Sequence, residues 1–484
     1  MSKQADRPDC ECLQDRESAQ RGVIRSLSTH FLIKKGENGT MVYSWKELGL
    51  KIPQITLPKA GTDYEKWAIV ACDQYTSQPK YWEQVEEIVG DAPSTLRMIL
   101  PEYYLEKPQE EEMLASIHGN MQQYLDDGLL ETLDPGCILV KRTAEGRRRL
   151  GLVMALDLEQ YDFSRGSTSM TRATERTVVE RIPPRMRIRR GAPMELPHIL
   201  ILIDDPERSI IKPLDEMDLK VVYDTDLMLG GGHVTGCFVP ENQLGPVQEA
   251  FSRLLDRTVE KYGHRNIFMY AVGDGNHSLA TAKTYWEELK PTLPPEERHN
   301  HPARYALCEI ENVHDDGIIF EPIHRVVFGN GRMTGEQIAR ALTQIMQEQN
   351  GAARCVAPEE MEAHRKVHEK AGGREYELKC FSGEKSWSLM IHDPTHALEI
   401  GVLQKALNVF TERMDGITVD YIHGDDTVRE LAADPGNLGF LLPAMDKFRL
   451  FPAVAFNGTL PRKTFSMGEA NEKRYYIEAR KIIK

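Results

Sequence analysis

The stretch IFMYAVGDGNHSLATAKTYW, residues 267–286, decides how the chain is expected to fold. Its first six residues, Ile267 to Val272, are apolar and predict a short buried strand. Gly273-Asp-Gly275 predicts a tight turn, because glycine adopts backbone angles that other residues avoid. Leu279 to Leu289 predicts a helix that Pro291 cannot continue. The sequence therefore predicts a strand, a glycine turn and a helix in direct succession.

The side chains at the mouth of this turn are candidates for chemistry. The first turn of a helix carries free N–H groups and a partial positive charge, which suit a phosphate. Asp274, as base or metal ligand, and His277, as donor or base, are the candidate catalytic groups here. The candidate phosphate-binding residues are Gly273, Gly275, Asn276 and Ser278. A simple capped turn would use the same residue types, so this alternative stays open.

The composition limits the classes of protein to which the chain can belong. The chain has 484 residues, 41% hydrophobic and 28% charged, which is ordinary for a globular protein with two or three cores. Its 60 basic and 74 acidic residues give a net charge of −14, which argues against a general nucleic-acid binder. No run approaches the roughly 20 apolar residues of a membrane span, and no signal peptide is evident. The eight cysteines form no C-x-x-C pair. We expect a cytoplasmic protein with no membrane or nucleic-acid partner.

Strands and helices alternate along the chain, with hairpins between some of them. This pattern predicts an α+β (mixed α/β) protein in two lobes. We expect a loosely held N-terminal extension at 1–40 and a main α/β domain at 41–330 that carries the glycine turn. A smaller C-terminal α+β lobe at 331–484 is expected to complete the site, and its tail to end in a charged helix.

Asp73 is a further candidate catalytic residue. It follows Trp67 to Cys72, which predicts a strand, and α/β folds place catalytic groups at strand ends. A strand end also needs a turn former, which is the alternative. His324 and Arg325 lie among strand-forming residues and are a candidate phosphate clamp, with a salt-bridged surface pair as the alternative.

The stretch from Arg165 to Arg190 is the most basic part of this acidic chain. Arginine pairs with phosphate in bidentate fashion, so the stretch is interpreted as an anion site or a partner surface. A solvated charged face would give the same pattern. Among the carboxylates, Asp73, Asp204, Asp226 and Asp274 are all candidate Mg²⁺ ligands, and the sequence does not choose among them.

Four motifs carry a resemblance: VGDGNHSLATA (272–282), EPIHRV (321–326), LPRKTF (460–465) and VACDQY (70–75). With them the chain resembles the bacterial domain-of-unknown-function family ten-fifteen over most of its length. The resemblance implies a ParB/sulfiredoxin-like core with a mixed sheet, a fold that includes nucleotide-dependent free-serine kinases. It places Asp274, Gly275 and His277 at the family's phosphate-holding turn, and His324 and Arg325 in its second motif.

The chain departs from the family's usual central motif, A-D-G-H-H-R-Y-E-T-A, at two positions. Asn276 stands in place of the first histidine and Ser278 in place of the arginine. Loss of that arginine removes a bidentate phosphate partner. Either Arg325 or the stretch from Arg172 to Arg190 replaces it, or this branch no longer binds a nucleotide in the same way.

The first functional hypothesis is phosphoryl transfer from ATP or ADP to a small hydroxyl metabolite, with a free amino acid as one candidate. Such a reaction depends on positioning and charge neutralisation, with Asp73 or Asp274 accepting the substrate proton and Mg²⁺ on the phosphates. The alternative is a nucleotide-binding switch without turnover. A third hypothesis is a metal-dependent hydrolase that uses the Asp and His clusters at 224–233, 314–316 and 423–426. The expected partners are a small-molecule substrate and a nucleotide, and a homodimer is compatible with the sequence.

Overall fold

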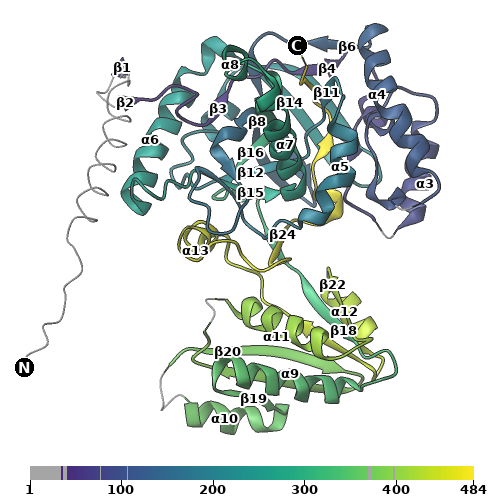
Figure 1. The fold of residues 1–484 in the computed structure, drawn as a ribbon, viewed down its shortest axis with the longest axis vertical. Coiled ribbons are helices and arrows are strands. Elements are labelled where there is room, and N and C mark those ends of the chain that lie inside the picture. The colour runs from purple at the N-terminus through teal and green to yellow at the C-terminus, as the bar shows by residue number, and fades with distance from the viewer. Residues whose placement is uncertain are drawn as a thin grey trace, which may run out of the picture.

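The computed structural model describes residues 34–35, 41–76, 78–105, 107–368, 373–395 and 398–483. These residues form a large lobe and a small lobe (Figure 1). They contain twelve α-helices, α2 to α13, together with mixed and antiparallel sheets, which confirms the predicted mixed α/β class. The predicted N-terminal extension lies outside the described residues, except for β1 (Lys34–Lys35). Every helix among the described residues is too short or too polar to cross a membrane.

The large lobe is built on a ten-stranded mixed sheet of order β13-β14-β7-β8-β16-β12-β15-β10-β9, with β3 paired to β8. Its strands are β3 (Leu50–Lys51), β7 (Gly136–Ala144), β8 (Arg147–Asp157), β9 (Tyr161–Asp162), β10 (Thr171–Ala173), β12 (Leu200–Ile203), β13 (Lys220–Leu227), β14 (Gly232–Pro240), β15 (Tyr270–Asp274) and β16 (Tyr305–Asn312). The pairs β12–β16, β10–β15 and β9–β10 are parallel, and the others are antiparallel. Both faces of the sheet are covered, so its central strand β12 is buried throughout.

Helices and short strands cover this sheet. The helices of the large lobe are α2 (Tyr64–Trp67), α3 (Pro79–Val89), α4 (Glu110–Asp126), α5 (Ile182–Arg189), α6 (Gly245–Tyr262), α7 (Asn276–Leu289), α8 (Pro295–Arg298) and α13 (Leu450–Asn457). Its short strands outside the sheet are β4 (Thr56–Pro58), β5 (Ile69–Val70), β6 (Leu130–Thr132) and β11 (Met194–Glu195), and β2 (Met41–Val42) pairs with β1. Apolar faces of α6 and α7 share one core with alternate residues of β12, including Ile201 and Ile203. The residues of α3 and β5 belong to the core on the opposite face.

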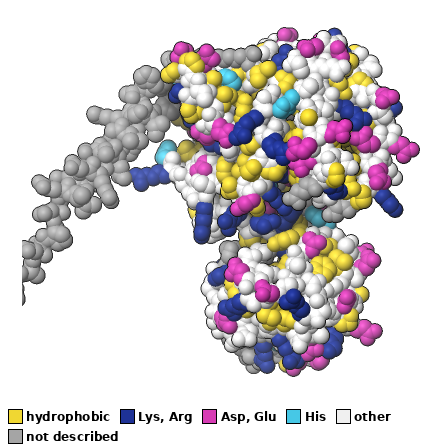
Figure 2. Space-filling view, turned by 45° about the vertical axis from the view of Figure 1, so that its right-hand side comes forward, with side chains coloured by type: hydrophobic (Ala, Val, Ile, Leu, Met, Phe, Trp, Pro, Cys, Tyr) yellow, Lys and Arg dark blue, Asp and Glu magenta, His cyan; other side chains and the backbone are white. Residues whose placement is uncertain are grey.

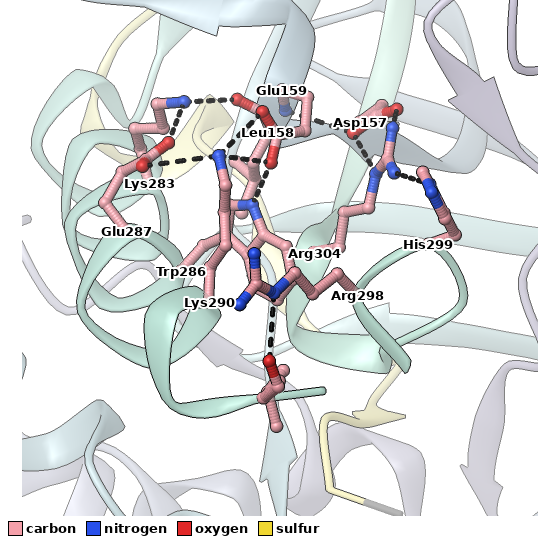
Figure 3. Close-up of polar contacts among 11 residues, drawn as sticks. Asp157, Leu158, Glu159, Lys283, Trp286, Glu287, Lys290, Arg298, His299 and Arg304 are labelled. Carbon is pink, nitrogen blue, oxygen red and sulfur yellow. Dashed lines mark hydrogen bonds and ion pairs between the residues drawn. The ribbon is translucent and has the colours of Figure 1, made fainter. Parts of the chain in front are cut away.

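Helix α7 is fixed to the large sheet by an apolar face and by a polar anchor. Leu279, Ala282 and Trp286 have no exposed surface, because their spacing puts them on one face of the helix. The indole Nε1 of Trp286 donates to Glu159 Oε1 at 2.7 Å, and Lys290 Nζ lies 2.8 Å from the same oxygen (Figure 3). The predicted strand, turn and helix are confirmed, although the strand begins at Tyr270 rather than Ile267.

The small lobe is a six-stranded antiparallel sheet of order β19-β21-β20-β23-β18-β22. Its strands are β18 (His324–Phe328), β19 (Ala353–Val356), β20 (Glu375–Ser382), β21 (Lys385–His392), β22 (Thr418–Ile422) and β23 (Asn437–Leu441), and its helices are α9 (Gly335–Asn350), α10 (Met361–His368), α11 (Glu399–Arg413) and α12 (Asp425–Ala432). Thr334 and Gln337 form a capping box that starts α9. The buried faces of α9 and α11 join the sheet in one core.

The C-terminal segment corrects the predicted domain organisation. Strand β24 (Phe465–Met467) pairs with β17 (Phe320–Pro322), β25 (Tyr475–Tyr476) with β5, and β26 (Arg480–Lys481) with β11. These partners belong to the large lobe or to its border, so the lobe predicted at 331–484 loses its last part. The charged helix predicted for the tail is wrong, because the tail satisfies its backbone groups by pairing with distant strands instead.

Candidate functional site

The turn between β15 and α7 is closely packed by the surrounding protein. Gly275 has a φ of 77°, in the left-handed region that favours glycine. A Cβ on Gly275 would lie 3.0 Å from the Cα of Ile199, and a Cβ on Gly273 would overlap Sδ of Met467. Both glycines are therefore required by protein packing, and on these sides the turn leaves no room for the phosphate predicted beside them.

The N-terminus of α7 itself remains suited to an anion. Gly275 is its N-cap and provides no side-chain cap, so the first-turn amides keep their donor capacity and the positive end of the helix dipole. Oδ1 of Asn276 is buried and has no hydrogen-bond partner among the described residues. The mouth of the turn thus presents backbone donors and one unsatisfied oxygen.

Asp274 is held in an ion pair with the C-terminal tail. Its Oδ1 accepts the N–H of Gly275 at 2.8 Å, and its Oδ2 lies 3.1 Å from Nζ of Lys473. Lys473 also donates to Oγ of Ser466 at 2.9 Å, and its side chain is largely buried. Asp274 is therefore the counter-ion that places Lys473 beside the turn. This pairing favours Asp73 over Asp274 as the proton acceptor.

His277 has a neutral imidazole ring, with one nitrogen that accepts a hydrogen bond and one that can donate. Its Nε2 accepts the backbone N–H of Val178 at 3.2 Å, so we assign the ring proton to Nδ1. Burial, and next the cations Arg185 and Arg181, lower the pKa of His277 to about 4. Near neutral pH the ring carries no charge, and the atom that would serve as a base is already occupied.

Ser278 lies at the end of a chain of hydrogen bonds that runs from Tyr476, in the C-terminal segment, through His198. The backbone N–H of Cys72 donates to the hydroxyl oxygen of Tyr476 at 3.2 Å, and that oxygen lies 2.7 Å from Nδ1 of His198. His198 Nε2 lies 2.8 Å from Oγ of Ser278. We assign the Tyr476 proton to the bond with Nδ1, so that His198 Nε2–H donates to Ser278. Ser278 is therefore not activated as a nucleophile, and its own proton is free for a ligand.

Asp73 is an ionised carboxylate beside this chain. Burial on its own would raise its pKa, but His198, the Gln74 amide, Arg185 and Lys473 together hold the pKa below its ordinary value. Gln74 Nε2 donates to Asp73 Oδ1 at 2.9 Å. Asp73 follows β5, as its predicted position at a strand end required, and it can accept a proton in a charged, partly enclosed setting.

Cations from separate segments surround these groups. Those that lower the pKa of His277 or His423 are Arg181, Arg185, Arg462, Lys463 and Lys473. His423 follows β22 at the tip of the small lobe, and desolvation, then Lys463 and Lys473, lower its pKa to about 4. Figure 2 shows Lys and Arg side chains gathered where the large lobe faces the small one. Cations from the large lobe thus act on His277 at the turn and on His423 in the small lobe.

Most arginines near the end of the predicted basic stretch form ion pairs with carboxylates. Arg187 pairs with Glu110 and Glu111, and the remaining ion pairs are Arg189–Glu195 and Arg190–Glu288. These pairs join α5 to neighbouring elements. Only Arg181 and Arg185 act on His277, and Arg185 also pairs with Glu102. Arg187, Arg189 and Arg190 are therefore paired with carboxylates, and the interpretation of Arg172 to Arg190 as an anion site stays a prediction for the other arginines.

The predicted clamp of His324 and Arg325 acts indirectly. Arg325 is 0% exposed, burial lowers its pKa to about 10, and its guanidinium donates to the carbonyl oxygens of Arg462 and Lys463 at 3.0 and 2.9 Å. His324 Nδ1 accepts the N–H of Leu442 at 3.1 Å. Arg325 therefore holds the loop that carries Arg462 and Lys463, and the direct phosphate contact of the pair stays a prediction.

Glu175 holds the same loop from the large lobe. Its two carboxylate oxygens accept the N–H groups of Lys463 and Thr464, each at 3.0 Å. Burial raises the pKa of Glu175. The loop at 462–464 is therefore held by Arg325 of the motif at 321–326 and by Glu175, although these residues lie far apart in the chain.

The clusters expected for a metal-dependent hydrolase contain ion pairs. His233 lies 3.0 Å from Asp224 and 2.8 Å from Asp226. The other pairs are Asp204 with Lys261 and His314, Asp316 with Arg208, and Asp425 with His324. Lys261 and Arg208 are thus counter-ions of Asp204 and Asp316, whereas the contact of Asp425 is with an imidazole whose pKa is lowered by burial.

An apolar cavity adjoins the Ser278 end of the hydrogen-bond chain. It has a volume of about 120 Å³, and its polar end includes Ser278, His198, Tyr476 and Arg185. Its apolar walls include Met98, Leu100, Met121, Met194 and Leu196. A polar end with apolar walls is the usual character of a small-molecule site.

Comparison with known proteins gives the family. A family model described as a protein of unknown function, DUF1015, matches residues 56–410, so the chain belongs to that family. No curated protein matches the chain.

Solved structures resemble the chain only weakly. A mutant free serine kinase in complex with ADP has 13% identity and a TM-score of 0.35, covering 68% of this chain and 91% of that one. A C-terminally truncated SbnI from Staphylococcus aureus has 8% identity and a TM-score of 0.33, covering 67% and 82%. A conserved hypothetical protein from Pyrococcus furiosus has 12% identity and a TM-score of 0.31, covering 68% and 90%. Similarity at this level carries no information about activity, and the relation to ParB and sulfiredoxin stays a prediction.

Proposed function

We propose that this member of the DUF1015 family transfers a phosphoryl group from ATP or ADP to the hydroxyl of a small metabolite. The observation that carries the proposal is the set of cations from separate segments around the uncapped N-terminus of α7, with the ionised Asp73 beside them. Phosphoryl transfer consists mainly of positioning and of stabilising negative charge, and this arrangement supplies both.

The phosphates would be held by cations and neutral donors. Arg181 and Arg185 come from one side of the turn, and the loop that carries Arg462 and Lys463 comes from the other. Nδ1–H of His277 and the hydroxyl of Ser278 provide uncharged donors at the helix N-terminus. In this proposal the arginines replace the guanidinium that the family motif has at the position of Ser278.

Asp73 would accept the proton of the substrate hydroxyl. The hydroxyl oxygen forms a bond to the terminal phosphorus, the bond from that phosphorus to the leaving phosphate oxygen breaks, and ADP or AMP departs with the electron pair. The residues that fit Mg²⁺ are Asp73 and Asn276, because Asn276 offers a buried oxygen with no partner among the described residues. Bound Mg²⁺ would supply further charge neutralisation on the phosphates.

The cavity beside Ser278 is the proposed place for the acceptor. Its volume of about 120 Å³ suits a small molecule such as a free amino acid. Arg185 at the polar end would pair with a carboxylate, and the apolar walls would contact an aliphatic part. An amino acid that carries a hydroxyl has both the carboxylate and the aliphatic part that these contacts need.

A nucleotide-binding switch without turnover is the second candidate. Met467 and Ile199 fill the space beside the two glycines, which narrows the approach of a phosphate to the turn. Such a site would bind nucleotide without bringing its terminal phosphate to Asp73.

The test has a binding part and a product part. Calorimetry with ATP and ADP, each with and without Mg²⁺, measures binding, and ³¹P NMR over a panel of hydroxyl amino acids and sugars detects product. We expect Asp73→Asn to lower turnover by about 10²- to 10⁴-fold and to keep nucleotide binding. Arg185→Gln should weaken nucleotide binding, and Arg187→Gln, on the same helix but paired elsewhere, is the matched control.

The outcomes separate the candidates. Nucleotide binding without product from any acceptor would support the switch and contradict the kinase. Absence of nucleotide binding, or equal effects of Arg185→Gln and Arg187→Gln, would contradict both.

A further inference from the structure

The small lobe carries a cluster of two imidazoles and one carboxylate that the proposed reaction does not use. His364 lies on α10, Glu375 is the first residue of β20, and His392 is the last residue of β21. Glu375 and His392 face each other in the antiparallel register of β20 and β21. Figure 1 shows α10 at the outer end of the small lobe, away from α7. The cluster is thus separate from the turn and its cations.

The three side chains converge on one point. Oε1 of Glu375 lies 3.1 Å from Nε2 of His364 and 2.9 Å from Nδ1 of His392. The three ligand atoms all lie within 4.8 Å of one another. The two imidazole rings have centroids 5.3 Å apart. Two ring nitrogens and a carboxylate oxygen are therefore directed at a common volume.

These separations are close to those of a metal centre. With Zn–N bonds of about 2.0–2.1 Å, tetrahedral ligands are about 3.3 Å apart. The pairs Glu375–His364 and Glu375–His392 need to open by only a few tenths of an ångström to reach this value. We propose that His364, Glu375 and His392 bind a divalent transition metal ion of the Zn²⁺ class.

The burial of the ligands differs between the helix and the strands. The His364 side chain is 3% exposed, whereas Glu375 and His392 are 29% and 21% exposed. The ligand from α10 is thus buried, and the two ligands from the strands are partly exposed. Imidazole nitrogen and carboxylate oxygen are the donors that suit Zn²⁺, and two histidines with one glutamate are a known ligand set.

The bound ion would fasten α10 to the sheet. One ligand comes from the helix and two come from neighbouring strands, so coordination cross-links elements that otherwise meet through side-chain contacts. Metal that binds only the folded lobe stabilises it by mass action.

The direct test is a titration of the full chain with Co²⁺ alone, after removal of metal with a chelator and without a histidine tag. Tetrahedral Co²⁺ absorbs visible light, and Zn²⁺ added afterwards should displace it. We expect one equivalent to bind, the melting temperature to rise, and His364→Ala and His392→Ala each to weaken binding by at least about ten-fold. His233→Ala is the matched control, because His233 lies between Asp224 and Asp226 and lacks a second imidazole.

A second variant covers the case in which His364→Ala does not fold. Glu375→Gln keeps the size of the side chain and an oxygen acceptor but removes the anionic ligand, and it should also weaken binding by at least about ten-fold. The proposal is overturned if no equivalent binds or if the three variants bind like the His233 control. It is also overturned if the spectrum has the charge-transfer band of cysteine thiolate ligation.

Discussion

The glycine turn at 273–278 and the tail at 465–482 both form the candidate site, yet they reach it in different ways. The turn is local: β15 and α7 follow each other in sequence and fix the directions of His277 and Ser278. The tail arrives from about two hundred residues further along the chain and brings Lys473 and Tyr476 to Asp274 and His198. The local sequence pattern thus determines the position of His277 and Ser278, whereas long-range strand pairing determines the position of Lys473 and Tyr476.

The largest expected effect concerns the tail. Arg474 is buried and pairs with two buried carboxylates, Glu309 and, at 2.7 Å, Glu478. Arg474→Met would leave both carboxylates without their cation, so we expect a loss of about 3–5 kcal/mol in the free energy of unfolding. Urea denaturation measures this loss. Arg187→Gln, at an exposed ion pair, is the control. If Arg474→Met and Arg187→Gln lower the free energy of unfolding by the same small amount, the tail is not part of the core.

A comparable effect is expected on the helix that follows the turn. Trp286 is fully buried and donates to Glu159 at 2.7 Å (Figure 3). Trp286→Ala would leave a cavity and remove one of the two donors to Glu159 Oε1, at a cost of about 3–5 kcal/mol. Denaturation of the two variants side by side tests whether the turn and the tail belong to one cooperative unit. Two separate transitions in either variant would contradict that expectation.

A smaller effect tests the contact between the two regions directly. Gly273→Ala places a Cβ on Sδ of Met467, which should destabilise the protein by about 1–3 kcal/mol. Met467→Ala removes the obstacle, so the double variant should recover part of the loss. Denaturation of the double-mutant cycle measures the coupling. Additive losses would place Met467 away from the turn.

The smallest effect is a pH dependence of stability within the turn. The pKa of His277 is about 4 in the folded protein, below the ordinary 6.5 of the unfolded chain. The unfolded state therefore binds the extra proton, and the stability present above pH 6.5 is lost as the pH falls toward 4. Between pH 7 and 5.5 we expect a contribution of at most about 1 kcal/mol, which His277→Gln should remove. The free energy of unfolding is measured by denaturation at the two pH values. If its change between them is the same in His277→Gln as in the parent protein, the neutral ring assigned to His277 is contradicted.

The sequence predicted the parts of the fold and site that depend on local pattern. The helix predicted at Leu279 to Leu289 is present within α7, and the strand predicted before Asp73 is present as β5, although it ends at Val70, three residues before Asp73. The mixed α/β class followed from the alternation of elements.

The remaining site residues had no local signal. His198 precedes a buried strand, where a histidine is unremarkable, and Lys473 and Tyr476 lie in a charged segment whose composition favoured a helix. Their roles arise from pairing of the tail with β5, which no short window contains. Arg325 was assigned to phosphate because its burial could not be read from sequence. The only hint for the loop with Arg462 and Lys463 was the motif at 460–465.

The pairing of β17 with β24 has a consequence for how the small lobe is attached. Pro322 and Phe465 are register partners, so the two ends of the segment that contains the small lobe and α13 lie side by side. In topology the whole small lobe is an insertion at the end of a β-hairpin. Insertions whose ends lie close together interrupt the host domain little. The zinc-class ligands at 364, 375 and 392 thus belong to an inserted module, whereas the cations from the tail belong to its host.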